Sequence, residues 1–334
     1  MSLYTAETRR LVKRRFTKLF VIGAMLVLAA VAAGVFFSNQ KVSPEQIAKA
    51  TAQAQAEYQQ AVQQSQEEKT KCQAAQGTAS ASQFPPGCEI YTPTQENFDP
   101  QWYMPATFDF RETFPAMVTT LAAVLAMVAF VIGASFVGAE WSSGGMMNLL
   151  LWRPRRLQVL GTKLAALLVS TTVLSVVLGA IWTGVFAFIA NTRGSLDSMT
   201  SGAWQSILLM EARALALVLA AGALGFGLAS LGRHTAMALG VAIGTIIVFQ
   251  FGLGTVLSLA KVKFPELYLA PFWVFAWINK EYRIEDYNSC DFTSSGCAPD
   301  SFTITWPMAG GLLAGIFVVI VGAAMWTMRS RDIT

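Results

Sequence analysis

The sequence predicts an all-α membrane protein with six transmembrane helices, and two observations lead to this fold class. Of its 334 residues, 54% are hydrophobic and only 13% are charged, whereas an ordinary soluble domain contains about a quarter charged residues. Six apolar runs are long enough to cross a hydrocarbon core, which takes roughly 20 residues as a helix. They lie near 19–37, 114–139, 164–190, 206–231, 236–260 and 307–328.

The positions of Lys and Arg predict that both termini are cytoplasmic. Basic residues precede the first run, separate the second from the third and the fourth from the fifth, and follow the sixth: Arg9, Arg10, Lys13, Arg14, Arg15, Lys18, Arg153, Arg155, Arg156, Lys163, Arg233, Arg329 and Arg331. Short cytoplasmic loops carry such an excess of positive charge. We therefore expect a multi-pass protein of the plasma (inner) membrane with a basic N-terminus at 1–18 and a cytoplasmic tail at 329–334. Because the net charge of +4 is concentrated beside spans, we expect no nucleic-acid partner.

The first run, 19–37, is expected to be an uncleaved membrane anchor. A cleaved secretory signal is the alternative, since "AAVAAG" at 29–34 offers small residues for cleavage. The apolar region of such a signal is about 7–15 residues long, however, and this run is longer. N-terminal sequencing of the mature protein distinguishes the two.

Residues 38–113 form the predicted extracytoplasmic insert. Its first half is rich in helix formers, with Ser43 as a plausible N-cap and Pro44 in the first turn. Its second half contains five prolines, which predicts irregular chain. The insert is either a helical cap over the outer mouth or a docking site for a substrate or a periplasmic or cell-wall partner.

All four cysteines lie in segments assigned to the outside, where disulfides are stable. Three connectivities are possible, and we favour pairing within each segment, Cys72 with Cys88 and Cys290 with Cys297. A metal site is less favoured, because neither pair has CxxC spacing and the only histidine, His234, lies on the opposite side of the membrane.

The outer loop at 261–306 contains a short aromatic stretch, "FPELYLAPFWVFAWINKEY". Its apolar core of about 11 residues is too short to span a bilayer as a helix. Trp and Tyr side chains suit the headgroup level, so this stretch is predicted to lie in or re-enter the outer leaflet before span six. Alternatively, it packs over the outer end of the bundle.

The segment 140–163 interrupts the apolar pattern on the cytoplasmic side. It keeps an apolar set, "MMNLLLW", before Pro154 and the basic pair Arg155 and Arg156. This pattern predicts a short amphipathic helix along the inner surface that ends at Pro154. Such a helix could dock a soluble partner.

In this segment the chain resembles the type-2 class of ABC exporter permeases. That class joins its second and third spans by a Glu, a Gly-containing turn, an apolar stretch and a Pro-x-Arg element leading to a Lys. The corresponding residues, which the resemblance assigns to coupling with an ATPase, are Glu140, Gly144, Gly145, Met146, Trp152, Pro154, Arg155, Arg156 and Lys163. The resemblance covers most of the chain apart from 38–113. It implies a homodimer or pseudo-dimer of permeases on two ATPase subunits, with Glu140 and the 145–156 helix transmitting ATPase closure.

The sequence contains no G-x-x-x-x-G-K-[ST] phosphate loop. ATP and Mg would therefore be bound by a separate ABC ATPase subunit, and we expect no cofactor and no catalytic residue in this chain. The expected function is export of an unidentified, amphiphilic substrate by alternating access. The alternative is a non-transporting relay or sensor that couples the ATPase to the extracytoplasmic insert.

Three polar residues within the apolar runs are candidates for a substrate pathway: Glu211, Arg213 and Gln250. Ionisable groups in a membrane are costly and suggest function. A plainer interpretation places Glu211 and Arg213 at the interface with their long side chains reaching water, and gives Gln250 a hydrogen bond between helices. Glycines in spans four and five also predict close helix packing or a dimeric surface.

Overall fold

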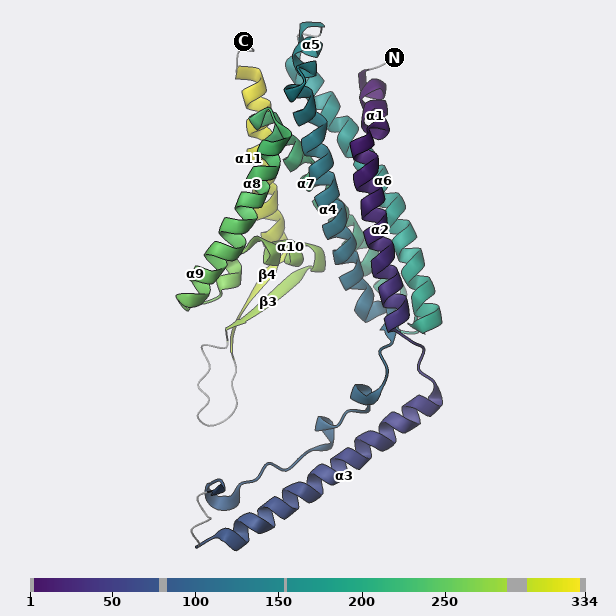
Figure 1. The fold of residues 1–334 in the computed structure, drawn as a ribbon, viewed down its shortest axis with the longest axis vertical. Coiled ribbons are helices and arrows are strands. Elements are labelled where there is room, and N and C mark those ends of the chain that lie inside the picture. The colour runs from purple at the N-terminus through teal and green to yellow at the C-terminus, as the bar shows by residue number, and fades with distance from the viewer. Residues whose placement is uncertain (1–2, 78–82, 153–154, 287–298, 331–334) are drawn as a thin grey trace. The chain divides into compact units, whose positions relative to one another are not determined.

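The computed structural model describes residues 3–77, 83–152, 155–286 and 299–330 (Figure 1). The chain divides into two compact units. Unit 1 consists of Met1–Ala32, Arg111–Phe186 and Met199–Thr334, and unit 2 consists of Ala33–Phe110 and Ala187–Ser198. Each unit is described by itself.

The prediction of six membrane-spanning helices is confirmed. The described residues contain six helices that are long and apolar enough to cross a bilayer: α2 (Arg15–Ser38), α4 (Phe110–Ser142), α6 (Arg156–Arg193), α7 (Ser201–Gly232), the stretch Thr235–Leu259 and α11 (Trp306–Ser330). The stretch Thr235–Leu259 comprises α8 (Thr235–Thr245), a π-helix (Ile246–Leu253) and α9 (Gly254–Leu259). Several helices extend beyond the apolar runs, because good helix formers continue into the polar flanks.

Helix α4 packs closely against α7 through glycines. A Cβ atom added to Gly133 would collide with the carbonyl oxygen of Gly222, and one added to Gly225 would collide with that of Phe130. Only residues without side chains allow two helix backbones to approach so closely. The predicted close packing at glycines is therefore found in span four, α7, where it packs against α4. In span five, by contrast, Gly240 and Gly244 have no atom within 4 Å of an added Cβ.

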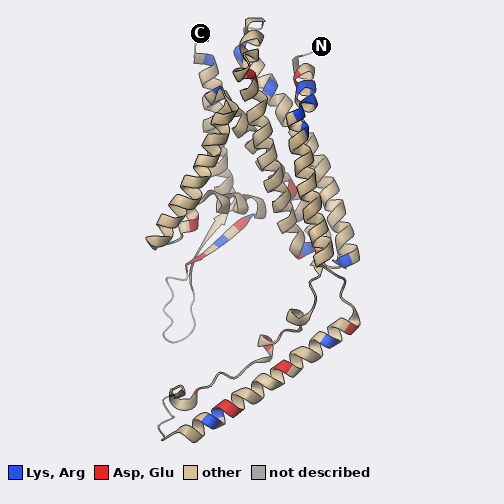
Figure 2. Cartoon of the chain, in the orientation of Figure 1, with Lys and Arg blue, Asp and Glu red and all other residues tan. Residues whose placement is uncertain are grey.

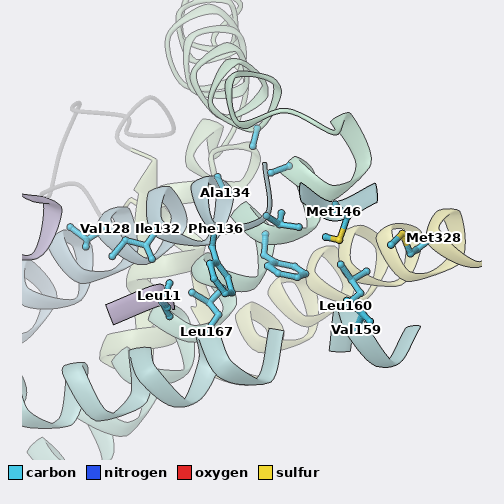
Figure 3. Close-up of a cluster of buried hydrophobic side chains, with 14 of the residues drawn as sticks. Leu11, Val128, Ile132, Ala134, Phe136, Met146, Val159, Leu160, Leu167 and Met328 are labelled. Carbon is cyan, nitrogen blue, oxygen red and sulfur yellow. The ribbon is translucent and has the colours of Figure 1, made fainter. Parts of the chain in front are cut away.

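One end of unit 1 contains a buried hydrophobic cluster that joins several helices (Figure 3). It includes Leu11 of α1 (Leu3–Lys13), Met146 of α5 (Gly145–Trp152) and Met328 of α11. The helices nearest the two termini and α5 therefore meet at the same end. Figure 2 shows Lys and Arg gathered there. This arrangement agrees with a shared cytoplasmic side, although the orientation in the membrane stays a prediction.

The loop 261–306 contains a β-hairpin that the all-α prediction omitted. Strands β3 (Glu281–Asp286) and β4 (Asp300–Thr305) pair antiparallel, with Tyr282 opposite Ile304 and Ile284 opposite Phe302. Polar and apolar residues alternate along both strands, as in a sheet with one buried face. The runs are short and lie among charged residues, so the signal was weak. Cys290 and Cys297 lie outside the described residues.

The aromatic stretch in this loop forms α10 (Ala270–Asn279), which is part of a second small hydrophobic cluster with the hairpin. Its Ala276 and Ile278 are buried, and the indole nitrogen of Trp277 donates to the carbonyl oxygen of Arg213 at 2.9 Å. These contacts favour the interpretation that α10 packs over the end of the bundle. Its position relative to the lipid stays a prediction.

Unit 2 is built on the long helix α3 (Pro44–Ala75). Ser43 caps this helix, since its hydroxyl accepts from the backbone N–H of Gln46 while the Gln46 side chain accepts from the backbone of Ser43. Two strands outside α3, β1 (Phe108–Asp109) and β2 (Gly194–Ser195), pair in parallel. Unit 2 thus contains the predicted helix and also chain from the far end of α6.

The part of unit 2 that follows α3, residues 83–107, is called the return segment, and it contains 3₁₀ turns at Pro86–Cys88, Gln95–Asn97 and Pro100–Tyr103. A disulfide joins Cys88 to Cys72 of α3. The Tyr91 carbonyl accepts from the Ser65 hydroxyl at 2.9 Å, and the Tyr103 hydroxyl donates to Glu57 at 2.5 Å. The partners move back along α3 as the segment advances, so the segment runs antiparallel to the helix.

Candidate functional site

Helix α5 is a separate short helix between α4 and α6. The turn before it depends on Gly144, whose φ of +73° lies in the left-handed region that glycine adopts at little cost. The backbone N–H of Gly144 donates to Trp141, and its carbonyl accepts from Asn148 in α5. The glycine therefore ends one helix and begins the next, which agrees with the predicted Gly-containing turn.

The two faces of α5 have different surroundings. Met146 is completely buried and Leu149 packs against the same hydrophobic cluster. Leu151 is 81% exposed and Met147 is also exposed. Met146, which the sequence analysis assigned to the coupling residues, thus contributes its side chain to the core, while Leu151 presents an apolar surface outward.

The structure locates the remaining predicted residues of this segment only in part. Arg155 is exposed, and Arg156 begins α6 and is partly exposed. Helix α5 ends at Trp152, whose side chain is outside the described residues together with Pro154. The helix is therefore shorter than the 145–156 expected from the sequence.

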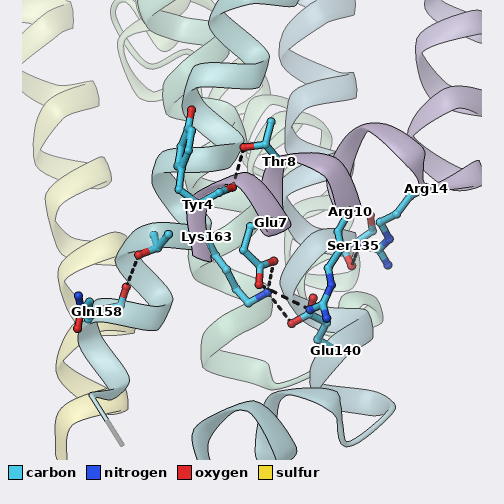
Figure 4. Close-up of polar contacts among 10 residues, drawn as sticks. Tyr4, Glu7, Thr8, Arg10, Arg14, Ser135, Glu140, Gln158 and Lys163 are labelled. Atoms are coloured by element: carbon cyan, nitrogen blue, oxygen red, sulfur yellow. Dashed lines mark hydrogen bonds and ion pairs between the residues drawn. The ribbon is translucent and has the colours of Figure 1, made fainter. Parts of the chain in front are cut away.

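Lys163 is the centre of a buried ionic cluster beside α5 (Figure 4). Its side chain is 0% exposed, and its Nζ lies 2.6 Å from Glu7 Oε2 and 2.7 Å from Glu140 Oε2. The Glu7 side chain is 1% exposed and that of Glu140 is 19% exposed. One lysine therefore links α1, the end of α4 and the start of α6. We call Glu7, Glu140 and Lys163 the ionic triad.

Together with Arg10, the triad is balanced in formal charge. Arg10 Nη1 lies 3.6 Å from Glu7 Oε1, so two cations face two carboxylates. The Lys163 ammonium also lies 5.0 Å from the centre of the Phe136 ring, within range of a cation–π interaction. Paired charges of this kind tolerate burial, whereas removing one partner leaves an uncompensated buried charge.

Glu7 is a residue of the candidate site that the sequence analysis missed. It occupies the inward face of α1 with Leu3 and Leu11, at intervals of four residues. It is also the single carboxylate among the basic residues of 1–18. An acidic residue on the apolar stripe of a basic helix was the available signal, but its buried partner Lys163 lies 156 positions away in the sequence.

A groove of about 710 Å³ lies next to the triad. Its lining includes Arg10 and Lys13 of α1 and Arg14, which lies between α1 and α2, together with Glu140 and Asn148. Arg14 also donates to the Ser135 carbonyl at 3.1 Å, which connects the junction of α1 and α2 with α4. The groove therefore combines the edge of α5 with a positively charged wall.

The predicted pathway residues do not form one site. The Glu211 carboxylate accepts from the Thr183 hydroxyl at 2.5 Å and lines a cleft between α4, α6 and α7. Arg213 donates to the Leu209 carbonyl, and Gln250 is half-buried in the π-helix. His234, the lone histidine, caps α8 by accepting from the backbone N–H of Ala236 at 3.1 Å.

Comparison with known families agrees with this architecture. A family model described as "ABC-2 family transporter protein" matches residues 1–328. The chain belongs to the ABC-2 transporter family. The match includes the insert at 38–113, which the resemblance in the sequence had not covered. A search among curated proteins finds no match.

Membership in the ABC-2 family, together with the six apolar helices, makes this chain a multi-pass membrane protein and indicates a permease role in an ABC transporter. The family in general implies a partner subunit that binds ATP. The exposed side of α5 is the candidate contact surface for such a subunit, and the buried ionic triad lies beside this helix.

Proposed function

We propose that this chain is the transmembrane subunit of an ATP-driven exporter and that α5 is its coupling helix. The observation that carries the proposal is the ionic triad, because Lys163 joins three helices immediately behind α5. The separate ATPase subunit would bind ATP and Mg, dock against α5, and pass its closure to the membrane helices.

The triad gives this transmission a mechanical basis. Met146 anchors α5 in the core, and Glu140 lies in the last turns of α4 just before it. A force on the exposed face of α5 would therefore act on α4 directly, and on α6 and α1 through Lys163. Rigid helices joined by buried ion pairs move together, so alternating access would proceed as a rigid-body tilt of these helices.

The groove beside α5 supports docking of a partner with acidic residues. Its wall carries Arg10, Lys13 and Arg14. Arg155, which follows α5 in the sequence, is also exposed. Complementary charges guide association, while a few apolar anchors supply most of the binding energy. On the described part of α5, Leu151 is a more exposed apolar side chain than Met147, so it is the stronger candidate for such an anchor.

The test uses the copurified complex and two matched leucines. Leu151 on α5 is 81% exposed and Leu259 at the end of α9 is 80% exposed. Leu151→Ala should weaken ATPase binding about fivefold or more, since truncating a central anchor costs more than about 1 kcal/mol, whereas Leu259→Ala should not. Arg155→Glu should likewise reduce binding more than Lys261→Glu. Equal ATPase binding and equal transport in all four variants would contradict the coupling assignment.

A second candidate function, a relay or sensor without transport, is favoured by one observation. Unit 2 is a separate compact unit with its own disulfide and a helix of 32 residues. A domain of this kind can serve as a working part rather than as a cap. Deleting residues 41–105 while assembly is retained separates the two: continued efflux from reconstituted vesicles supports the exporter, and lost signalling without measurable efflux supports the relay.

The proposed exporter would form a homodimer or pseudo-dimer in the plasma (inner) membrane with both termini in the cytoplasm. The exposed apolar surfaces of α2, α6 and α11 support contact with lipid or with a second permease. An amphiphilic substrate suits such a protein, since it would enter from the cytoplasm or from the inner leaflet.

A further inference from the structure

A cleft of about 440 Å³ lies between α4, α6 and α7 in unit 1. Most of its lining is apolar, including Leu121 and Leu125 of α4 and Leu215 and Val218 of α7. All three helices belong to the membrane-spanning set. The lining of the cleft is therefore chemically complementary to an apolar chain.

One charged group lines this cleft among the described residues, the carboxylate of Glu211. Thr183 Oγ1 is its one hydrogen-bond partner in the described part of the chain. A carboxylate offers about four acceptor positions on two oxygens, so most of its capacity is unused. A cation that approached Glu211 through the cleft would find a strong partner, because charge interactions are strengthened where water is scarce.

Besides Glu211 and Thr183, Ser175 also brings a polar side chain to the lining of this cleft. Ser175 is 8% exposed, and its hydroxyl oxygen is buried without a hydrogen-bond partner among the described residues. Ser175 precedes Thr183 by eight residues on α6, which corresponds to roughly 12 Å along a helix axis. Buried polar groups usually have partners. The cleft thus has a charged group at one level and an unused hydroxyl at another.

We propose that this cleft binds an amphiphile that carries a protonated amine on an apolar tail. The amine pairs with Glu211, and the tail lies against Leu121, Leu125 and Val218. No Lys or Arg lines the cleft among the described residues. A zwitterionic phospholipid would therefore leave its phosphate without a cationic partner, so the composition favours an amine without phosphate.

The binding site is independent of the proposed coupling mechanism. It lies on α4, α6 and α7, while α5 and the ionic triad involve α1 and the opposite portion of α6. Binding can be measured on the permease chain without an ATPase. Failure of the coupling assignment and failure of this proposal are thus distinguishable.

The test measures binding of radiolabelled dodecylamine to the full chain in phosphatidylcholine nanodiscs. Unlabelled dodecylamine should compete at least about tenfold better than dodecanol, which has the same tail, since a charged hydrogen bond contributes about a factor of ten. Glu211→Gln should weaken dodecylamine binding by about the same factor, while Glu266→Gln, outside the cleft, should not. Thr183→Val should retain binding because the carboxylate remains.

A second pair of variants tests the position of the tail. Gly179 lines the cleft, and an added Cβ there has no atom within 4 Å. Gly179→Leu should therefore fill the cleft and reduce binding without a backbone collision. Gly184→Leu is the matched control on the same helix, because Gly184 also has open space and does not line the cleft.

Three results would overturn the proposal. Equal competition by dodecanol and dodecylamine would show simple partition of the tail into an apolar groove. Competition by phosphatidylethanolamine as strong as that by dodecylamine would assign the cleft to a bilayer headgroup. Efficient crosslinking of two Val176→Cys chains to each other would show that a second copy covers the cleft.

Discussion

The buried ammonium of Lys163 contacts residues from two other helices, α1 and α4. Glu7 comes from the helix before the first span, Glu140 from the end of the second span, and Phe136 lies one turn before Glu140. Burying a lysine ammonium without a partner of opposite charge would cost much free energy. Its two carboxylates therefore hold the side chain and the three helices in place.

Replacing Lys163 by methionine should be strongly destabilising. Lys163→Met preserves much of the volume but leaves two carboxylates facing each other, and breaking a buried ion pair costs about 3–5 kcal/mol. The thermal unfolding temperature of the purified chain should fall clearly. Lys18→Met, at an exposed position of the neighbouring α2, should change it little. An unchanged unfolding temperature in Lys163→Met would show that the triad is not formed.

The double variant Glu7→Leu with Lys163→Met should recover part of that loss. It removes the fully buried pair, and the remaining Glu140 is 19% exposed and can be hydrated. Apolar replacement of a buried ion pair is often tolerated. The double-mutant cycle should therefore give a coupling free energy of about 1–3 kcal/mol between residues 7 and 163. Additive losses would contradict direct pairing.

Glycines on different helices differ in whether the surrounding structure has room for a side chain. Between α4 and α7, Gly225 has no room for a side chain because the Phe130 carbonyl lies against it. On α8, Gly240 has open space on the side where a Cβ would point. Residues of the same type, with the same predicted role, thus belong to different environments.

Alanine at these two glycines should change stability in opposite directions. Gly225→Ala should destabilise the chain by about 1–3 kcal/mol through overpacking, whereas Gly240→Ala should stabilise it by up to about 1 kcal/mol through helix propensity. Unfolding in mixed micelles with increasing denaturing detergent measures both. Stabilisation by Gly225→Ala would show that α4 and α7 do not pack as described.

The return segment of unit 2 is attached to α3 partly through a pH-sensitive contact. The Tyr103 hydroxyl donates to the Glu57 carboxylate, which lowers the pKa of Glu57 below its ordinary value of 4.5 and raises the pKa of Tyr103 above its ordinary 10.0. The folded state favours ionised Glu57. The contribution of this contact to folding stability is therefore complete above pH 4.5 and is lost as the pH falls through the lowered pKa of Glu57. The folded state also favours neutral Tyr103. The corresponding contribution to folding stability is present below pH 10.0 and is lost as the pH rises through the raised pKa of Tyr103.

Amide hydrogen exchange of residues 101–103 should therefore speed up at acidic pH beyond its intrinsic pH dependence. Tyr103→Phe should remove this extra acid sensitivity and leave the Cys72–Cys88 disulfide intact. Gln101→Ala in the same turn is the control, since it leaves the Glu57–Tyr103 contact in place. An identical pH profile in Tyr103→Phe and the parent chain would exclude this contact as the cause.

At the scale of the whole molecule, the clustered ends of α1, α5 and α11 agree with an even number of spans. Tags at both termini should be accessible from the cytoplasm, and a tag in 78–82 should be accessible from the outside. The expectation follows from six crossings combined with the basic residues beside them. Protease protection in inverted and right-side-out vesicles measures it, and termini on opposite sides would contradict the topology.

The sequence by itself determined the class of protein and its element order. Long apolar runs must form helices in a bilayer because every backbone polar group needs an internal partner, and Ser43 with Gln46 specified the start of α3 locally. The turn at Gly144 was also readable, since only its immediate neighbours are involved. Each of these features depends on residues close together in the chain.

Only the tertiary structure decided how distant residues combine. Lys163 belonged to the basic residues that predict orientation, but its burial against Glu7 spans 156 positions of sequence. Met146, a predicted coupling residue, has its side chain in the core because α5 lies on the hydrophobic cluster. The β3–β4 hairpin and the Glu211 cleft likewise arise from packing between elements. Local pattern specifies which helices form, whereas burial and charge pairing depend on which helices meet.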